Sequence, residues 1–109
     1  MNSITTNLKR ASIEIILLSL LKEGDKYGYQ LAQEIKTKTD YKLAILEGSM
    51  YTILNRLKDH GDVTFSRQVV GTKMTRVYYH LTESGRERLA GMVEKFNNDI
   101  DIISQLINK

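Results

Sequence analysis

The stretch EGSMYTILNRLKDHG, residues 47–61, predicts the helix on which the fold depends. At about 100° per residue, its apolar side chains gather on one side: Met50, Ile53, Leu54 and Leu57. The opposite side carries Thr52, Asn55, Arg56 and Asp59, with Ser49 and Tyr51 at the edges. Hydrogen-bonding groups mixed with one arginine suit contact with a partner whose surface has unevenly placed polar groups. We therefore interpret this side as a binding face.

Two further helices are predicted before this one. The first runs from about Leu8 to Lys22 and is apolar on nearly every side, which is typical of a central helix. Thr5 or Thr6 is expected to cap it, and Gly24 to close it. The second runs from about Tyr27 to Lys38. Its inward side chains are Leu31, Ala32 and Ile35.

A β-hairpin is predicted after Gly61. The segments VTFSRQVV and KMTRVYYHL are rich in β-branched and aromatic residues and flank Gly71-Thr72. The hairpin carries Arg67, Lys73 and Arg76 and has no acidic residue between positions 64 and 81. The net charge of the chain is only +3, but positive charge is concentrated on this hairpin. Among its tyrosines, Tyr79 is predicted to lie in the core.

The last predicted helix opens at Thr82, whose hydroxyl suits a helix cap. Apolar residues recur along it at intervals of four, three, four, three and four: Leu89, Val93, Phe96, Ile100, Ile103 and Ile107. This is the seven-residue repeat of a seam between paired helices. Ile102 and Leu106 form a second stripe that could lie on the first helix. If one stripe packs on the chain's own first helix, the other is left for the same helix of a second chain. The pattern therefore predicts a homodimer.

Together these elements predict a mainly α chain with a β-hairpin wing. We expect a winged helix-turn-helix DNA-binding domain over residues 1–81 and a C-terminal dimerisation helix over 82–109, in one structural unit. In such a fold the second helix of the pair enters the major groove of double-stranded DNA. The side chains expected to face bases and phosphates are Ser49, Tyr51, Thr52, Asn55 and Arg56, with Lys73 and Arg76 from the wing. Asn55 and Arg56 suit bidentate contacts to adenine and guanine.

Three strings carry a family resemblance: YGYQLAQEI, EGSMYTILNRLKDHGDV and VYYHLTESGRERL. With them the chain resembles the PadR family of bacterial transcriptional regulators, in its branch with a short C-terminus, over residues 8–106. The resemblance implies a homodimeric repressor that binds a palindromic operator and is released by small molecules. It places the DNA-contacting positions of the family on Tyr27, Ser49, Tyr51, Thr52, Lys73 and Arg76.

The resemblance also implies an effector site. Multidrug-sensing members hold flat aromatic compounds at the dimer interface against a tryptophan of the last helix, and Phe96 occupies that position here. Phenylalanine keeps a stacking face and lacks the indole donor. Phe96 therefore has two interpretations, interface core or platform for a small aromatic effector. Glu14, in an otherwise apolar helix, is either a paired structural charge or a polar lining of that cavity.

Other functions are less consistent with the sequence. The 109 residues contain no cysteine, and no nucleophile paired to a base, phosphate loop or metal-ligand cluster stands out, so we expect no enzyme and no cofactor. His60 and His80 do not have the spacing of metal ligands. No membrane span or signal segment is predicted, and we expect a cytoplasmic protein. The alternative function is a winged-helix module that binds another protein, against which Arg56, Lys73 and Arg76 count.

Overall fold

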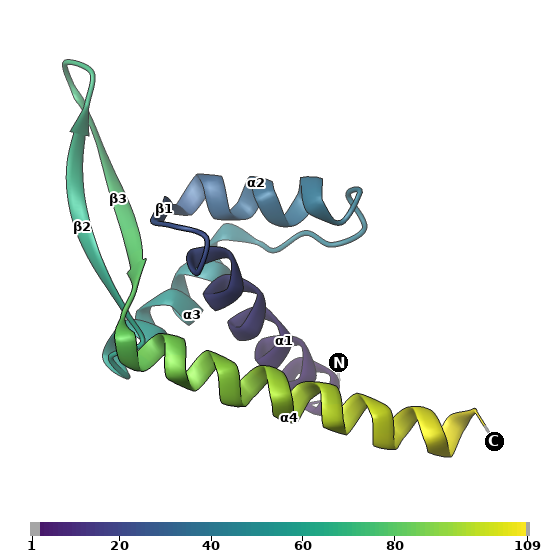
Figure 1. Cartoon of the computed structure of the whole chain (residues 1–109). Coiled ribbons are helices and arrows are strands. Elements are labelled where there is room, and N and C mark those ends of the chain that lie inside the picture. The colour runs from purple at the N-terminus through teal and green to yellow at the C-terminus, as the bar shows by residue number, and fades with distance from the viewer. Residues whose placement is uncertain (1–2, 109) are drawn as a thin grey trace.

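The computed structural model describes the backbone of residues 3–108 and the side chains of residues 10–108. Along the chain its elements are α1 (Ser3–Leu21), β1 (Lys26–Tyr27), α2 (Gly28–Lys38), α3 (Glu47–Asp59), β2 (Val63–Val70), β3 (Met74–Leu81) and α4 (Glu83–Ile107). The hairpin of β2 and β3 projects from the helical body, and α4 runs along the body and past it (Figure 1). The molecule is accordingly elongated, measuring 59 × 29 × 24 Å. The predicted class, mainly α with a hairpin wing, is confirmed.

The first helix is longer than the sequence predicted. α1 begins at Ser3, so Thr5 and Thr6 lie inside the helix. The prediction that one of them caps it is wrong, because a cap residue needs a non-helical backbone. At the other end α1 stops at Leu21, and the turn that follows contains Gly24 at φ +145°. Glycine enters this left-handed region without the steric cost of a Cβ atom.

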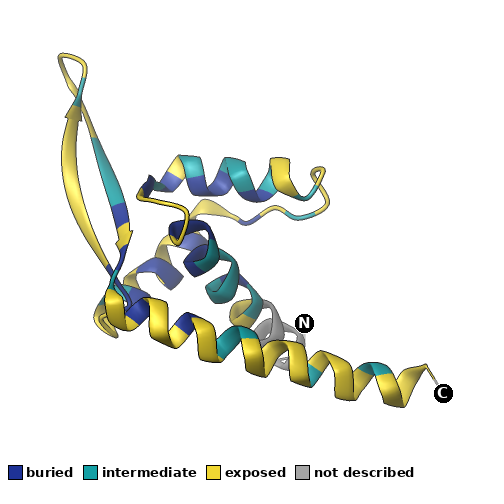
Figure 2. Cartoon of the chain, in the orientation of Figure 1, coloured by how far each residue is buried: buried dark blue, intermediate teal, exposed yellow. Residues whose placement is uncertain are grey.

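The core lies where α1, α2 and α3 meet the base of the wing. All four residues predicted to face inward from α3 are buried, as are the three predicted for α2. Figure 2 shows the buried positions concentrated on these helices and few of them on α4. The largest fully buried side chains are Leu17, Leu18, Leu31, Ile35, Met50, Leu54, Leu57 and Val63. Packing of these apolar faces fixes the orientation of α3.

The end of α3 directs the chain into the wing. The Asp62 amide donates to the Leu57 carbonyl at 2.9 Å and the Gly61 amide to the Lys58 carbonyl at 2.9 Å. Together these bonds form a Schellman motif, which requires a left-handed residue. Gly61 meets that requirement at φ +80°, so the predicted stop at Gly61 is confirmed.

The wing belongs to an antiparallel sheet of order β1-β3-β2. Val63 pairs with Leu81 at its base and Val70 with Met74 near its tip. Strand β1 was not predicted, because a segment of two residues has no periodicity of its own. It exists by pairing Tyr27 with Tyr78 on β3, so α2 begins at Gly28, one residue later than expected. Tyr79 is 7% exposed, which confirms its predicted place in the core.

A compact joint connects α3, the wing and α4. The buried Asp62 carboxylate accepts from Arg88, and its carbonyl accepts from the Thr82 amide at 3.1 Å. The Thr82 hydroxyl accepts from the Gly85 amide at 2.9 Å, which confirms the predicted cap of α4. A Cβ atom at Gly85 would overlap the Asp62 carbonyl oxygen. The joint therefore fixes the direction in which α4 leaves the wing.

The predicted seam on α4 is shorter than expected. Leu89 is 4% exposed in the core of its own chain, which removes it from the surface that a partner could cover. Val93 packs partly against the same core. The remaining seam residues, Phe96, Ile100, Ile103 and Ile107, are all exposed. The second stripe could have packed on α1, but Ile102 and Leu106 are 51% and 69% exposed. The described side chains of α1 therefore do not cover it.

Candidate nucleic-acid interface

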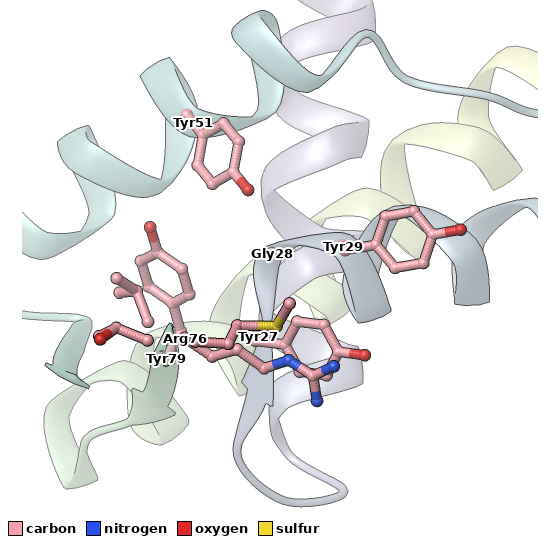
Figure 3. Close-up of a pocket in the computed structure, with 9 residues that line it drawn as sticks. Tyr27, Gly28, Tyr29, Tyr51, Arg76 and Tyr79 are labelled. Atoms are coloured by element: carbon pink, nitrogen blue, oxygen red, sulfur yellow. The ribbon is translucent and has the colours of Figure 1, made fainter. Parts of the chain in front are cut away.

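A hollow of about 560 Å³ lies between the start of α2, the side of α3 and the wing. Its lining combines four tyrosines with one arginine. Tyr51 from α3 and Tyr79 from β3 extend into the same space, and Arg76 lies beside Tyr27 (Figure 3). The lining residues are Tyr27, Gly28, Tyr29, Tyr51, Met74, Thr75, Arg76, Val77 and Tyr79. Three of the residues predicted to contact DNA, Tyr27, Tyr51 and Arg76, therefore meet in one hollow.

Tyr51 joins α3 to the first residue of α2. Its ring occupies the space that a Cβ atom at Gly28 would need. Burial raises the pKa of the Tyr51 hydroxyl, and the nearby Glu47 carboxylate raises it further. Burial also raises the pKa of Tyr79. The Tyr51 hydroxyl, protonated at neutral pH like that of any ordinary tyrosine, can donate a hydrogen bond to an anionic group.

Arg76 is held in place by aromatic contacts. Its Cζ atom lies 4.3 Å from the centre of the Tyr27 ring, within cation–π range. The Tyr27 ring meets Tyr78 edge-on, with centres 5.5 Å apart. Among the described residues no carboxylate forms an ion pair with Arg76. The guanidinium is therefore not engaged by a described carboxylate and lines the hollow.

The outer side of α3 places Ser49, Thr52 and Asn55 in solvent. Thr52 donates its hydroxyl proton to the Gly48 carbonyl at 3.0 Å, inside the helix. Arg56 is only half-exposed and lies at the flank of α3 that faces α1. There its Nη1 atom lies 3.2 Å from Oε1 of Glu14. A helical projection of α3 alone could not show this partner, which is 42 residues distant in sequence.

The ion pair between Arg56 and Glu14 affects the interpretation of both residues. The Glu14 side chain is 13% exposed, so the pair satisfies a carboxylate that is otherwise largely buried. This contact supports the structural interpretation of Glu14 over a lining role. The bond to Glu14 engages one amine of the Arg56 guanidinium, and the DNA contact of Arg56 stays a prediction. Lys73, by contrast, is exposed in the turn at the wing tip and does not line the hollow.

Several contacts near this surface were not predicted. Tyr29, Met74 and Thr75 line the hollow although the sequence indicated no role for them. Nδ1 of His80 lies 2.8 Å from the Asp25 carboxylate, which joins β3 to the turn before β1. Lys58 lies over the Phe65 ring at 5.0 Å. The lining of the hollow and the contact between Lys58 and Phe65 depend on the sheet and on helix packing, so no local signal in the sequence could have indicated them.

A second hollow of about 400 Å³ lies between α1 and α4. It is mainly apolar and is lined by Ala11, Ser12, Ile15, Met92, Lys95, Phe96, Asp99, Ile100, Ile102 and Ile103. Phe96, the predicted effector platform, is one of these residues. Glu14 is not, since its carboxylate pairs with Arg56.

The chain matches the model of the transcriptional regulator PadR-like family over residues 17–91. It belongs to this family. The negative transcriptional regulator PadR of Bacillus subtilis is 30% identical over 77 residues, which are 71% of this chain and 42% of that regulator. The chain therefore spans less than half the length of this curated relative.

Two solved structures extend the comparison with PadR-like regulators. A transcriptional regulator from Clostridium thermocellum superimposes with a TM-score of 0.83 at 30% identity, covering 96% of both chains. Bacillus subtilis PadR in complex with operator DNA superimposes with a TM-score of 0.69 at 28% identity, covering 75% of this chain and 47% of that one. The resemblance inferred from the three sequence strings is thus confirmed at the level of family and fold.

Two further features bear on the class of protein. Across residues 3–108, no helix is both long and apolar enough to cross a membrane. The described side chains include no group of three or more histidines, cysteines, aspartates or glutamates placed to hold a metal ion. The family to which the chain belongs consists of transcriptional regulators.

Proposed function

We propose that this chain is a homodimeric transcriptional repressor that binds a palindromic operator in double-stranded DNA and responds to a small aromatic effector. The observation that carries the proposal is the arrangement of Arg76, Tyr27 and Tyr51 around one hollow beside the exposed side of α3. The operator complex of Bacillus subtilis PadR, a relative of the same fold, supports it.

The hollow suits a phosphate of the DNA backbone. Helix α2 starts there, and its N-cap residue Tyr27 makes no side-chain capping bond to the first amides of the helix. Helix N-termini attract anions through such amides and through the helix dipole. Arg76 adds a full positive charge and Tyr51 a hydroxyl donor at the same place. We expect these groups to position the protein on the backbone while α3 reads bases.

Self-association would use the exposed apolar side of α4. Phe96, Ile100, Ile103 and Ile107 are between 37% and 72% exposed in the single chain and follow one helical stripe. Contiguous apolar surface of this kind usually marks an interaction site. Two α4 helices paired along it would place two copies of α3 at a fixed separation, as a palindrome with half-sites about 34 Å apart requires.

The effector would occupy the hollow between α1 and α4. Its lining is largely apolar, and Phe96 offers a ring on which a flat aromatic molecule can stack. Phe96 and Ile103 also belong to the proposed seam, so a molecule bound there would alter the geometry of helix pairing. We propose that this change moves the two α3 helices off the half-site spacing.

The salt dependence of binding tests the proposal. In a gel-shift titration against the upstream region of its own gene, six to ten phosphate contacts would weaken binding by about 10³-fold or more between 50 and 200 mM salt. Arg76→Gln should reduce the log-log slope by about 0.9 for each phosphate that the variant no longer neutralises. Arg86→Gln removes the same charge from an exposed position of α4 and should leave the slope unchanged. Absent or salt-insensitive binding to duplex DNA would favour a protein-binding module instead.

A further inference from the structure

An exposed apolar side chain precedes α3. Leu46, the residue before the helix, is 80% exposed, the highest value among the large exposed apolar side chains described. It holds the N-cap position, where serine, threonine, asparagine or aspartate would satisfy a free amide. Leu46 makes no such bond and contributes little to the core. Its side chain therefore serves neither helix capping nor folding.

Gly48 is likewise unexplained by the packing of the chain. It lies inside α3 with a negative φ, where glycine is less favourable than alanine. No described atom lies within 4 Å of the position that a Cβ atom would take, so nothing in the described chain requires glycine there. A helix surface without a side chain lets another molecule approach the backbone closely.

Thr52 lies one turn after Gly48 on the same side of α3 and adds a methyl group there. Its hydroxyl donates its single proton to the Gly48 carbonyl at 3.0 Å. What the exposed side chain offers a partner is then a methyl group and an acceptor lone pair. Arg56, the nearest positively charged side chain in the sequence of α3, is paired with Glu14. Leu46 and Thr52 therefore offer apolar contacts beside the polar side chains of Ser49 and Asn55.

We propose that Leu46 and Thr52 contact the 5-methyl groups of thymines in the major groove, and that Gly48 makes room for them. The inference rests on the proposed function, since it assumes that α3 enters that groove. In B-DNA only thymine presents a methyl group there, and apolar side chains contact it. The N-terminal residues of a recognition helix are the ones that meet base edges. Leu46 and Thr52 are thus specificity-determining residues.

Replacing thymine by uracil tests this directly, because the two bases differ only by the methyl group. The upstream region of the gene is prepared once with thymidine and once with deoxyuridine, and the dissociation constants of both duplexes are measured by gel shift. Burial of one methyl group corresponds to about fourfold in affinity. Wild-type protein should bind the thymine duplex at least fourfold more tightly, and more if both half-sites contribute.

The variant Leu46→Ala identifies the residue responsible. Alanine is as poor a helix cap as leucine, and the side chain is exposed, so folding should be retained. We expect the thymine preference to fall at least threefold in this variant. Val69→Ala, which shortens a 74% exposed side chain on the wing, should keep the wild-type preference. Any effect of uracil on duplex shape acts on all three proteins and cancels in the comparison.

The outcomes separate the inference from the proposed function. Salt-dependent binding with equal affinity for both duplexes would overturn the proposed contacts with thymine methyl groups and leave operator binding intact. An unchanged thymine preference in Leu46→Ala would overturn the assignment of Leu46. Failure of wild-type protein to bind either duplex in a salt-dependent way would overturn the proposed function and this inference with it.

Gly48→Ala tests the close approach. Without a DNA partner, the substitution should raise the thermal midpoint, because alanine is the better helix former and the space is open. With DNA it should weaken binding to the thymine duplex at least tenfold, since the added methyl occupies the space of the base edge. A more stable protein with unchanged affinity would refute the role of Gly48.

Discussion

Arg56 shows how a single side chain can depend on a distant partner. The periodicity of residues 47–61 places it away from the buried side of α3, which is where the structure has it. At the flank of the helix, however, it meets Glu14 of α1 at 3.2 Å. An arginine in this position contributes to the fold, and a loss of DNA binding on its removal would have two causes to distinguish.

We expect Arg56→Ala to lower the free energy of unfolding by about 1–3 kcal/mol, because it leaves the largely buried Glu14 carboxylate without a partner. The double variant Glu14→Ala, Arg56→Ala should recover part of this loss. Urea unfolding of the wild type, the two single variants and the double variant gives the coupling energy. A double variant that is stable but still binds the operator weakly would assign a DNA contact to Arg56. Additive effects would contradict the ion pair.

The sequence predicted the parts of the site that depend on local pattern. The apolar side of α3 follows from periodicity, so its exposed side, with Ser49, Thr52 and Asn55, followed as well. The hairpin and the Thr82 cap also have local signals. The contacts of Arg76 with Tyr27 and of Arg56 with Glu14 join segments far apart in sequence. Their formation depends on sheet register and helix packing, which a single sequence does not reveal.

At the scale of elements, two joints hold the helices and the wing in place. One consists of Asp62, Thr82, Gly85 and Arg88 and fixes α4 to the base of the wing. The other lies between the end of α1 and α2, where the buried Lys26 is bonded to Glu34 at 3.0 Å and Lys38 to Glu23 at 3.0 Å. Both joints connect helices and wing to the rest of the chain, so their stability affects how these elements are placed.

Two glycines of α4 provide a matched test of the first joint. Gly85→Ala should destabilise the fold by about 1–3 kcal/mol, because its Cβ atom would overlap the backbone of Asp62. Gly91→Ala, in open space on the same helix, should stabilise by about 0.5–1 kcal/mol. Urea unfolding measures both. Equal effects of the two substitutions would show that Gly85 has no packing role.

The second joint predicts a pH dependence. Hydrogen bonds from Lys38 and then Lys26 lower the pKa of the Glu23 carboxyl below its usual 4.5. A lowered pKa in the folded state stabilises the fold above pH 4.5, and this contribution is lost as the pH falls through the folded value. Glu23→Gln should therefore reduce the thermal midpoint at pH 7. At a pH well below 4 the variant and the wild type should coincide, whereas a constant difference would exclude the linkage.

At the scale of the whole molecule, operator binding as we propose it depends on self-association through the exposed side of α4. Ile103 lies in the proposed seam and in the lining of the α1–α4 hollow, so the proposed pairing and effector binding would share a surface. If the dimer has two pairing geometries, a molecule bound in this hollow favours one of them only to the extent that it binds that geometry more tightly than the other. The effector response should therefore require an intact dimer.

Ile103→Asp should convert the dimer to a monomer, because it places a charge in the middle of the apolar stripe. Sedimentation equilibrium measures the association, and a gel shift on the upstream region measures its consequence for binding. Gln105→Glu adds the same charge to an exposed position outside the stripe and should leave both unchanged. One α3 helix can contact only one half-site, so the monomer should lose at least the affinity contributed by the second. A monomeric variant that binds the full operator as tightly as the wild type would show that α4 does not set the spacing of the two reading helices.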